Sequence, residues 1–458
     1  MSALPEALTA GLTMHARLPR PSRRSFLAAT LGGGALAGCT APGSSGSQDS
    51  RVSDHVAALD ERFADLADET AQWEPISAAE RMRRRVRLGK ILEVAGQDAL
   101  LVEPGATMDY LTGVTWGHSE RLFALVVDAG GEHFWIVPGF EEEKARLRID
   151  RDGSPDDAAA RQKPGGPILT WKEHEHPYAL LASAMRERGV TRLAIEPQLR
   201  YGFVAGLAAA LPTLQITNGA PLVLDLRGRK DEHELALMRR ANELTLQAIT
   251  ATAEQLQPGM TGWDISELVL HAQQRLGLRD LWDLSLIGPA AAYPHGTQRD
   301  IPLERGQMVL IDTGGALHGY QSDNTRTWVF DAEPTERQRD VWQAVRDAQR
   351  VAYEGIRPGR RAGEIDDLAR QSLTDAGYGP DYRLFSHRLG HGIGMEGHED
   401  PYFDSGSQVI LQPGMTLSNE PGVYVYGELG VRIEDIIVVT LEGADHFGDW
   451  QPGPAWPS

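Results

Sequence analysis

The segment VLIDTGGALHGYQSDNTRT, residues 309–327, carries two aspartates in a pattern that predicts a β-hairpin. An apolar run ends on Asp312, a Gly-Gly pair follows, and Asp323 opens a second extended stretch. With a turn centred on Leu317 and His318, the two aspartates would lie directly opposite each other on one face. Cβ atoms of such a pair are roughly 5 Å apart. The two carboxylates would therefore be close enough to chelate one cation.

A second hairpin of the same kind is predicted at residues 417–435, LSNEPGVYVYGELGVRIED. Folding about Gly427 places Glu420 opposite Glu434, again on one face. A glycine-rich loop containing His391 lies between the two hairpins in sequence. Four carboxylates and one imidazole suit a site for two metal ions roughly 3.5–4 Å apart, as in metal-assisted hydrolysis.

Each of these residue types has a commoner structural use. An aspartate beside Gly-Gly is usually a turn residue, and a glutamate at a strand end is usually solvated. The joint pattern favours metal binding, because both hairpins are symmetric about their turns and the histidine lies between them.

The strings around these residues resemble the pita-bread metallohydrolases, a family that includes prolidase, aminopeptidase P and methionine aminopeptidase. The matching strings are YPHGT, IDTGG, SDNTRT, HRLGHGIGMEGHE, SNEPGVY and GVRIED, at residues 293–297, 311–315, 322–327, 387–399, 418–424 and 430–435. Upstream, DALLVEPGATMDYLTG and SERLFALVV are similar to the amino-terminal domain of prolidase and aminopeptidase P, which methionine aminopeptidase normally lacks. The resemblance implies an α/β (α+β) fold, with a creatinase-like mixed α/β domain followed by a pita-bread catalytic domain.

The resemblance also implies a role for each ligand candidate. Asp312 would bind one ion, His391 and Glu420 would bind the other, and Asp323 and Glu434 would bridge them. A water shared by the ions would act as nucleophile, with Glu420 as general base. Carboxylate ligands suit hard divalent ions, so Mn²⁺ is the expected metal, while the imidazole leaves Zn²⁺, Co²⁺ or Fe²⁺ open.

Three further histidines and an arginine fall within the matching strings. The resemblance implies that His295 donates to the developing oxyanion and that His398 contacts substrate near the scissile bond and assists the leaving group. His387 would bind substrate or support the site from behind. Arg432 shares a strand face with Glu434 and is expected to hold that ligand, and it is also a candidate for substrate binding.

The predicted activity is hydrolysis of the bond between an amino-terminal residue and proline. The substrate is a peptide with proline at its second position, and dipeptides and longer peptides both remain open. One alternative is hydrolysis of another small amide on the same site. A second is a non-catalytic binding protein on the same fold, against which the presence of Glu420, His295 and His398 argues.

Four segments are predicted along the chain: an export signal at 1–38, a flexible Ser/Gly/Pro-rich tether at 39–52, the amino-terminal domain at 53–225 and the catalytic domain at 226–458. Within the catalytic domain, helices are predicted from Asp231 and at 263–276, 334–355 and 363–376.

The formal net charge of −19 argues against nucleic acid as a partner. The resemblance implies a homodimer or homotetramer. A loop carrying Trp116 would then either close a neighbouring site or pack within its own domain.

The amino terminus contains SRRSFLAATLGGGALAGC, residues 22–39. Its apolar stretch is too short to span a bilayer, so it is interpreted as the core of a signal. The arginine pair Arg23-Arg24 resembles a twin-arginine export signal, and Leu-Ala-Gly-Cys ending at Cys39 resembles a lipoprotein cleavage site. The protein is therefore expected on the periplasmic or cell-surface side, attached to the membrane only through a lipid on Cys39. Translation from Met1 or Met14 remains open.

If this interpretation holds, exported protein begins at a modified Cys39, because cleavage and lipidation occur at that residue. Mass spectrometry of membrane-extracted protein checks this, and Cys39→Ser should release the protein from the membrane fraction. Exported protein that retains an intact Met1 would contradict it.

Overall fold

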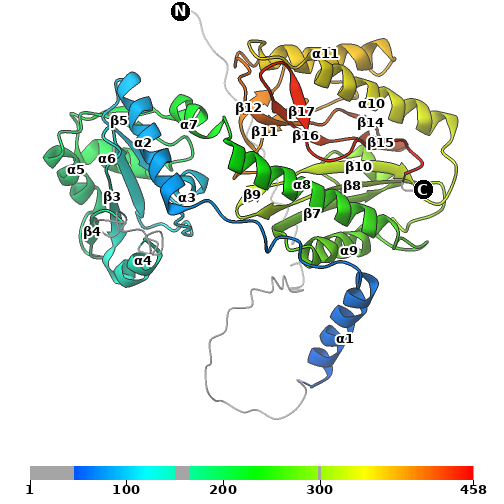
Figure 1. The fold of residues 1–458 in the computed structure, drawn as a ribbon, viewed down its shortest axis with the longest axis horizontal. Helices are drawn as coiled ribbons and strands as arrows, with labels where there is room; N and C mark the ends of the chain where they lie inside the picture. The colour runs from blue at the N-terminus through cyan, green and yellow to red at the C-terminus, as the bar shows by residue number, and fades with distance from the viewer. Residues whose placement is uncertain (1–45, 150–164, 298–300, 457–458) are drawn as a thin grey trace, which may run out of the picture. The chain divides into compact units, whose positions relative to one another are not determined.

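A computed structural model describes residues 46–149, 165–297 and 301–456 (Figure 1). The predicted export signal and Cys39 lie outside these residues. Helix α1 (Gly46–Arg62) begins within the segment predicted as a flexible tether, so residues 46–52 are helical. After Gly46 the helix contains no glycine or proline, which explains why its backbone continues unbroken. Across the described residues, every helix is too short or too polar to span a bilayer.

The amino-terminal domain is built on a six-stranded sheet with helices on both faces. Leu101 and Val126 pack under α5 and α6, whereas Leu100 and Val127 pack under α2, α3 and α7. This two-sided burial explains the nearly continuous apolar runs of the strands. The sheet order is β4-β3-β2-β1-β5-β6, with β1 (Ala99–Val102), β2 (Ala124–Asp128), β3 (His133–Pro138), β4 (Ile168–Trp171), β5 (Arg192–Ile195) and β6 (Gln215–Asn218). The helices are α2 (Ala78–Val94), α3 (Ala106–Thr112), α4 (Glu142–Ile149), α5 (Pro177–Glu187), α6 (Tyr201–Ala210) and α7 (Ala220–Arg227).

Trp116 packs within its own domain, as one of the two expectations for it stated. Its ring stacks on Phe123 with centroids 4.3 Å apart. Lys144 and Arg148 of α4 lie over the same ring, at 4.3 and 5.1 Å from its centroid. The half-buried indole is thus held by contacts inside the domain.

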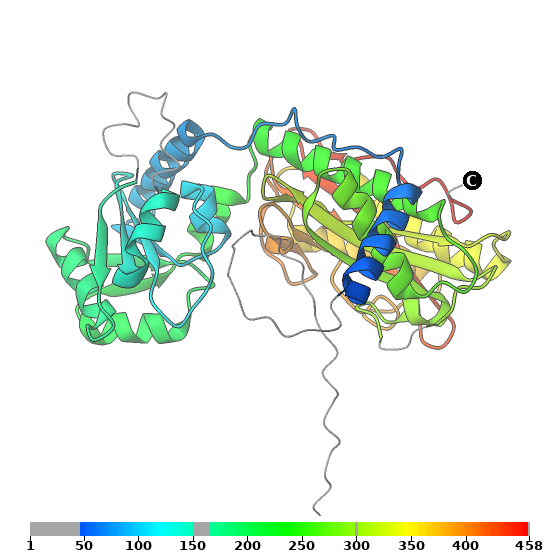
Figure 2. The same ribbon diagram turned by 90° about the horizontal axis from the view of Figure 1, so that it is seen from below.

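The catalytic domain places its sheets between two helix pairs, α8 with α9 and α10 with α11 (Figures 1 and 2). One sheet has the order β10-β8-β7 with β9 paired to β8, a second has the order β12-β11-β13-β16-β17, and β14 pairs with β15. The helices are α8 (Glu232–Ala253), α9 (Gly262–Arg275), α10 (Glu336–Gly355) and α11 (Ala362–Asp375). The strands are β7 (Arg279–Ile287), β8 (Met308–Leu317), β9 (Tyr320–Gln321), β10 (Asn324–Val329), β11 (Gly390–Gly392), β12 (Glu399–Phe403), β13 (Thr416–Asn419), β14 (Gly422–Val425), β15 (Leu429–Arg432), β16 (Asp435–Val439) and β17 (Ala444–His446).

An isolated bridge between Thr325 and Glu434 joins the two halves of the catalytic domain. Thr325 belongs to β10, and Glu434 directly precedes β16. The two predicted hairpins therefore meet at this bridge, which brings their carboxylates into one cavity.

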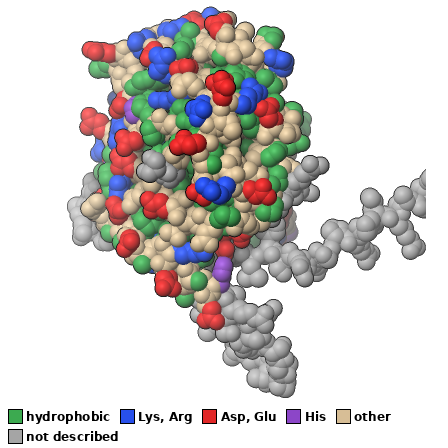
Figure 3. All heavy atoms as spheres, turned by 90° about the vertical axis from the view of Figure 1, so that its right-hand side faces the viewer, with side chains coloured by type: hydrophobic (Ala, Val, Ile, Leu, Met, Phe, Trp, Pro, Cys, Tyr) green, Lys and Arg blue, Asp and Glu red, His purple; other side chains and the backbone are tan. Residues whose placement is uncertain are grey.

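Charged side chains of both signs are scattered over the face shown in Figure 3. On the face shown in Figure 3, the described acidic and basic side chains are interspersed rather than gathered by sign. This distribution and the net charge of −19 offer no basic patch to a nucleic acid on that face.

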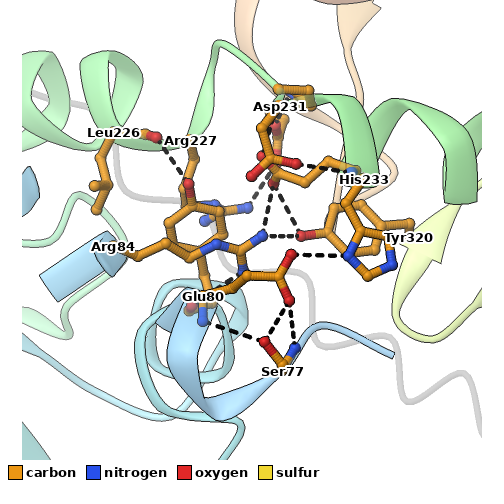
Figure 4. Close-up of polar contacts among 12 residues, drawn as sticks. Ser77, Glu80, Arg84, Leu226, Arg227, Asp231, His233 and Tyr320 are labelled. Carbon is orange, nitrogen blue, oxygen red and sulfur yellow. Dashed lines mark hydrogen bonds and ion pairs between the residues drawn. The ribbon is translucent and has the colours of Figure 1, made fainter. Parts of the chain in front are cut away.

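A buried arginine connects the amino-terminal domain to the catalytic domain (Figure 4). Arg84 of α2 donates from Nη2 to the Tyr320 hydroxyl at 2.8 Å, and the same atom lies 3.3 Å from Glu234. The Tyr320 hydroxyl donates in turn to Glu234 at 2.9 Å. Burial raises the pKa of Glu234, and the charge of Arg84 opposes that rise. Tyr320 opens β9, so this contact anchors the first hairpin near its turn.

Replacing Arg84 should leave Glu234 buried without its cation. Arg84→Met keeps the aliphatic stem, and breaking a buried pair costs about 3–5 kcal/mol. A loss of that size corresponds to a fall in thermal midpoint of roughly 6–20 °C for a domain of this size. Calorimetry should show this fall for Arg84→Met and almost none for Arg83→Met, whose side chain is exposed on the same helix. Equal midpoints for the two variants would contradict the role of Arg84.

Candidate metal centre

The first hairpin forms with a register that differs from the predicted one. Leu317 pairs with Tyr320, so the turn residues are His318 and Gly319, one position later than expected. Both have positive φ, 50° and 87°, which is the conformation that a two-residue hairpin turn favours.

The shift changes the partner of each aspartate. Asp312 lies opposite Thr325 instead of Asp323. Asp323 is two positions before Thr325, the residue opposite Asp312, so the two aspartates are diagonal neighbours on one face. Diagonal Cβ atoms are roughly 7–8 Å apart, still within reach of a shared cation.

The second hairpin has the predicted register. Gly422 pairs with Arg432 on one side of the acidic pair, and Asn419 pairs with Asp435 on the other. Both pairs imply that Glu420 lies opposite Glu434. Gly427 has a φ of 82° at the centre of the loop, a conformation that glycine adopts without strain.

The five predicted ligands come together. Three overlapping groups each offer ligand atoms within 4.8 Å of one another: Asp312 with Asp323 and Glu434, His391 with Glu420 and Glu434, and Asp323 with His391 and His398. The Nε2 atom of His391 lies 3.6 Å from Asp323 and 3.4 Å from Glu420. Asp323, Glu434 and His391 each belong to two of these groups, so the groups share ligand atoms and form one cluster.

The orientation and the protonation state of the His391 imidazole both suit a metal ligand. Its Nδ1 lies 3.1 Å from the Gly392 carbonyl, to which a protonated Nδ1 donates. This leaves Nε2 as the acceptor that faces the carboxylates. Burial lowers the pKa of His391 to about 3, and the nearby His398 lowers it further, so the ring is neutral at physiological pH.

The carboxylates are held close together in a buried cavity. Burial raises the pKa of Glu420 to about 8, with the charge of Arg432 opposing and that of Asp312 adding to the rise. Burial, followed by the charges of neighbouring carboxylates, raises the pKa of Asp323 and Glu434 well above the usual range. The protein alone therefore does not stabilise full ionisation of this cluster.

Divalent cations fit this site. Oδ1 of Asp312 and Oδ1 of Asp323 are buried, and neither accepts a hydrogen bond from the described residues. Buried carboxylate oxygens without a donor are costly unless a cation meets them. Glu434 differs from the two aspartates, because its Oε2 accepts a hydrogen bond from the Thr325 hydroxyl at 2.7 Å.

The prediction that Arg432 holds Glu434 is wrong, because its guanidinium binds other partners. Its Nη2 donates to Oδ2 of Asp312 at 2.5 Å, and its Nη1 donates to the Tyr424 hydroxyl at 2.9 Å. The reason lies in the bridge between the two halves. Thr325 is paired with Asp312 in one direction and with Glu434 in the other, which brings Arg432 within reach of Asp312.

His387 supports the site from behind through Tyr424. Its Nε2 is 2.7 Å from the Tyr424 hydroxyl, and its Nδ1 is 2.7 Å from the Arg388 carbonyl. Burial lowers the pKa of His387 to about 3, with the charge of Arg432 adding to the effect. A neutral His387 with Nδ1 protonated can accept from the Tyr424 hydroxyl through Nε2, which orients that hydroxyl and, through it, Arg432.

His398 and His295 lie at the open side of the same cavity, and both are exposed. The His398 ring stacks on that of His391, with centroids 3.7 Å apart and planes 23° apart. The cavity has a volume of about 350 Å³. Its lining comprises Trp282, Leu284, Pro294, His295, Asp312, Asp323, His387, Arg388, His391, His398, Glu420, Arg432 and Glu434, which includes every predicted site residue of the catalytic domain.

Sequence reasoning missed Arg388 in this cavity and Tyr424 behind it. Arg388 lines it, with its guanidinium 4.0 Å from the centroid of the Tyr402 ring. Tyr424 links His387 to Arg432. Both stand inside the matching strings, at HRLGH and SNEPGVY, so their position beside His387 and Glu420 was the available signal.

Comparison with known families and proteins supports the same assignment. A sequence profile of metallopeptidase family M24 matches residues 236–441, and one of the creatinase/prolidase amino-terminal domain matches residues 84–228. The chain is 32% identical to the Xaa-Pro dipeptidase of Lactobacillus delbrueckii subsp. lactis over 368 residues, which cover 79% of this chain and 95% of the relative. It is also 32% identical to the Xaa-Pro dipeptidase of Pyrococcus horikoshii over 363 residues, covering 78% and 95%.

Solved structures give the same fold. The crystal structure of dipeptidase PepE from Mycobacterium ulcerans matches with a TM-score of 0.75 and 31% identity, covering 83% of this chain and 98% of that one. The predicted fold class, a creatinase-like α/β domain followed by a pita-bread domain, is confirmed.

Removal of one shared carboxylate should abolish both metal sites. Asp323 belongs to two of the overlapping ligand groups, so Asp323→Ala should leave almost no metal after dialysis, measured by elemental analysis. Asp340→Ala, an exposed aspartate on α10, should retain the metal content of the unchanged protein. Two tightly bound ions per chain in Asp323→Ala would refute the bridging position.

Proposed function

The chain belongs to metallopeptidase family M24, and we propose that it hydrolyses the bond between an amino-terminal residue and proline with the help of two divalent ions. The main support is a single observation: four carboxylates, an imidazole and two exposed histidines line one cavity. Relatives that are named Xaa-Pro dipeptidase cover most of the chain and support the choice of substrate.

Five residues would hold the ions. Asp312, Asp323 and Glu434 form one ligand group, and His391, Glu420 and Glu434 form another. Bound ions would supply a lowered pKa for water and polarisation of the substrate carbonyl. Because four of the five ligands are carboxylates, Mn²⁺ is the proposed metal, with Zn²⁺, Co²⁺ and Fe²⁺ as alternatives that the imidazole also suits.

Glu420 is the proposed general base. Its Oε1 accepts from the Ser418 hydroxyl at 3.2 Å and lies 3.4 Å from His391, so the carboxylate is held at the cavity wall. Its pKa of about 8 reflects burial among other acids, and a base with a raised pKa is suited both to take a proton and to return it.

The two exposed histidines are the proposed substrate contacts. Burial lowers the pKa of His398, and the charge of Arg388 lowers it further, so a neutral ring can donate one hydrogen bond to the peptide. His295 faces the same cavity and is the proposed donor to the oxyanion that forms on the attacked carbonyl.

Arg388 favours substrates that carry a carboxylate close to the scissile bond. Its guanidinium lines the cavity and stacks on Tyr402, and within the described ranges no carboxylate forms an ion pair with it. A dipeptide ending in proline has its terminal carboxylate next to the cleaved bond, whereas a longer peptide has an amide there. We therefore favour dipeptides over longer peptides.

Export by the twin-arginine route, a lipid on Cys39 and assembly into a homodimer or homotetramer complete the proposal. The support for export and lipidation is the sequence around Arg23, Arg24 and Cys39, which lies outside the described residues.

The purified mature protein with Mn²⁺ should cleave Xaa-Pro dipeptides faster than Xaa-Pro tripeptides, because only dipeptides offer Arg388 a nearby carboxylate. Liquid chromatography of the released residue gives both rates. Arg388→Met should reduce this preference, mainly by slowing dipeptide cleavage.

Glu420→Gln tests whether the metal cavity carries out the reaction with Glu420 as its base. It keeps an oxygen ligand but cannot accept a proton, so turnover should fall by more than metal content does. Cleavage of another small amide but not of Xaa-Pro peptides would favour the alternative hydrolase. Tight binding of peptide without turnover would favour a non-catalytic binding protein.

A further inference from the structure

Two buried cations from the segment that joins the domains meet one glutamate beside the cavity. Lys230 donates from Nζ to Oε1 of Glu399 at 2.6 Å. Arg227, the last residue of α7, donates from Nη2 to Oε2 of Glu399, also at 2.6 Å. All three residues are less than 9% exposed. Each carboxylate oxygen of Glu399 therefore accepts from a different cation, and both contacts are buried.

This ion triad holds the loop that presents His398. Glu399 follows His398 in the chain, and Arg227 also donates to Glu396 at 2.9 Å, so its contacts bracket the histidine on both sides. The backbone of Glu399 pairs with Gly392, which follows the ligand candidate His391. The loop is thus fastened at its start, at its end and to the strand that carries His391.

The His398 ring has little else to fix its position. Among the described residues, none forms a hydrogen bond with this ring. The ring stacks on that of His391. Stacking sets the distance between two rings but restrains sliding and rotation weakly. The orientation of His398 toward a substrate therefore depends on its backbone, which the triad holds.

The loop is packed tightly around the triad at Gly394. A Cβ atom at this position would lie 2.6 Å from Oε1 of Glu399 and 2.8 Å from Cε of Lys230. The Gly394 carbonyl accepts from the Gln321 amide at 2.8 Å, which ties the loop to β9 of the first hairpin. The close approach of Lys230 thus requires glycine here, and the loop cannot shift without disturbing the ion pair.

A buried ion pair is a poor source of stability, because desolvation of the charges offsets most of their attraction. It does fix geometry, since separating the charges inside the protein is costly. We propose that Arg227 and Lys230, acting through Glu399, position His398 at the metal cavity. The catalytic consequence of this inference rests on the proposed function, whereas its structural part does not.

Lys230→Met and Glu399→Gln test the proposal. Lys230→Met leaves Glu399 paired with Arg227, and Glu399→Gln keeps the shape of the side chain. The matched control is Arg229→Met, because Arg229 is adjacent in sequence but pairs with Asp225 at the surface, where the two side chains are 38% and 47% exposed. Metal content should be unchanged in all three variants.

The first measurement is the reactivity of His398 with diethyl pyrocarbonate, mapped by mass spectrometry on folded protein without substrate. The stack on His391 covers one face of the ring, so a loosened loop should raise the rate of modification. We expect faster labelling of His398 in Lys230→Met and Glu399→Gln, and an unchanged rate in Arg229→Met. This result does not depend on which substrate the enzyme takes.

The second measurement is turnover of an Xaa-Pro dipeptide. A displaced catalytic contact costs on the order of 10- to 100-fold in rate, so kcat should fall by that factor in Lys230→Met while KM changes little. In a His398→Ala background, Lys230→Met should lower kcat by almost nothing more, because the two changes remove the same contact.

A purely structural triad would give a different pattern. Lower thermal midpoints with unchanged His398 labelling, or equal additional losses of kcat with and without His398, would overturn the inference. If no peptide is cleaved but labelling rises as expected, the proposed substrate is wrong and the positioning role stands.

Discussion

Repulsion among buried carboxylates governs the metal centre of this protein. Asp323, Glu420 and Glu434 face one another in a cavity where burial alone already raises their pKa values. Arg432 binds Asp312, and Arg388 also lines the cavity. Two guanidinium groups cannot balance four acids, so the fold is arranged for charges that arrive with metal ions. The surrounding strands, loops and second hydrogen-bonding layer serve to keep these acids together.

Much of this arrangement is predictable from local sequence. The acidic pair on the second hairpin has its predicted register because Gly427 marks the turn and the flanking strands are regular. Helix α8 begins after Asp231, whose capping box with Glu234 satisfies exposed backbone groups. The turn of the first hairpin was predicted one residue too early, because a positive φ is uncommon outside glycine and His318 adopts one. Gly319 was the one residue whose type indicated the true turn. A shift of one residue in the turn changes the cross-strand partner of every residue in the hairpin.

Contacts between distant segments were not predictable in the same way. Arg432 and Glu434 share a strand face, yet Arg432 binds Asp312, which is far away in sequence. That choice depends on the bridge between Thr325 and Glu434, which no hairpin pattern reveals. The contacts of Arg84 with Tyr320 and of Arg227 with Glu399 are also long-range, and they form only when both domains are in place. Family strings located the residues, but packing determined their partners.

The amino-terminal domain contacts the catalytic domain at two places that matter for the site. Arg84 holds Tyr320 beside the turn of the first hairpin, and Arg227 holds the loop that carries His398. Both contacts bury a guanidinium against a carboxylate, an arrangement that contributes little net stability but penalises alternative geometries. Two domains held only by apolar packing could slide by small amounts at little cost. A cavity whose carboxylates and histidines come from separate strands and loops needs a more restrictive attachment between the domains, and these ion pairs provide it.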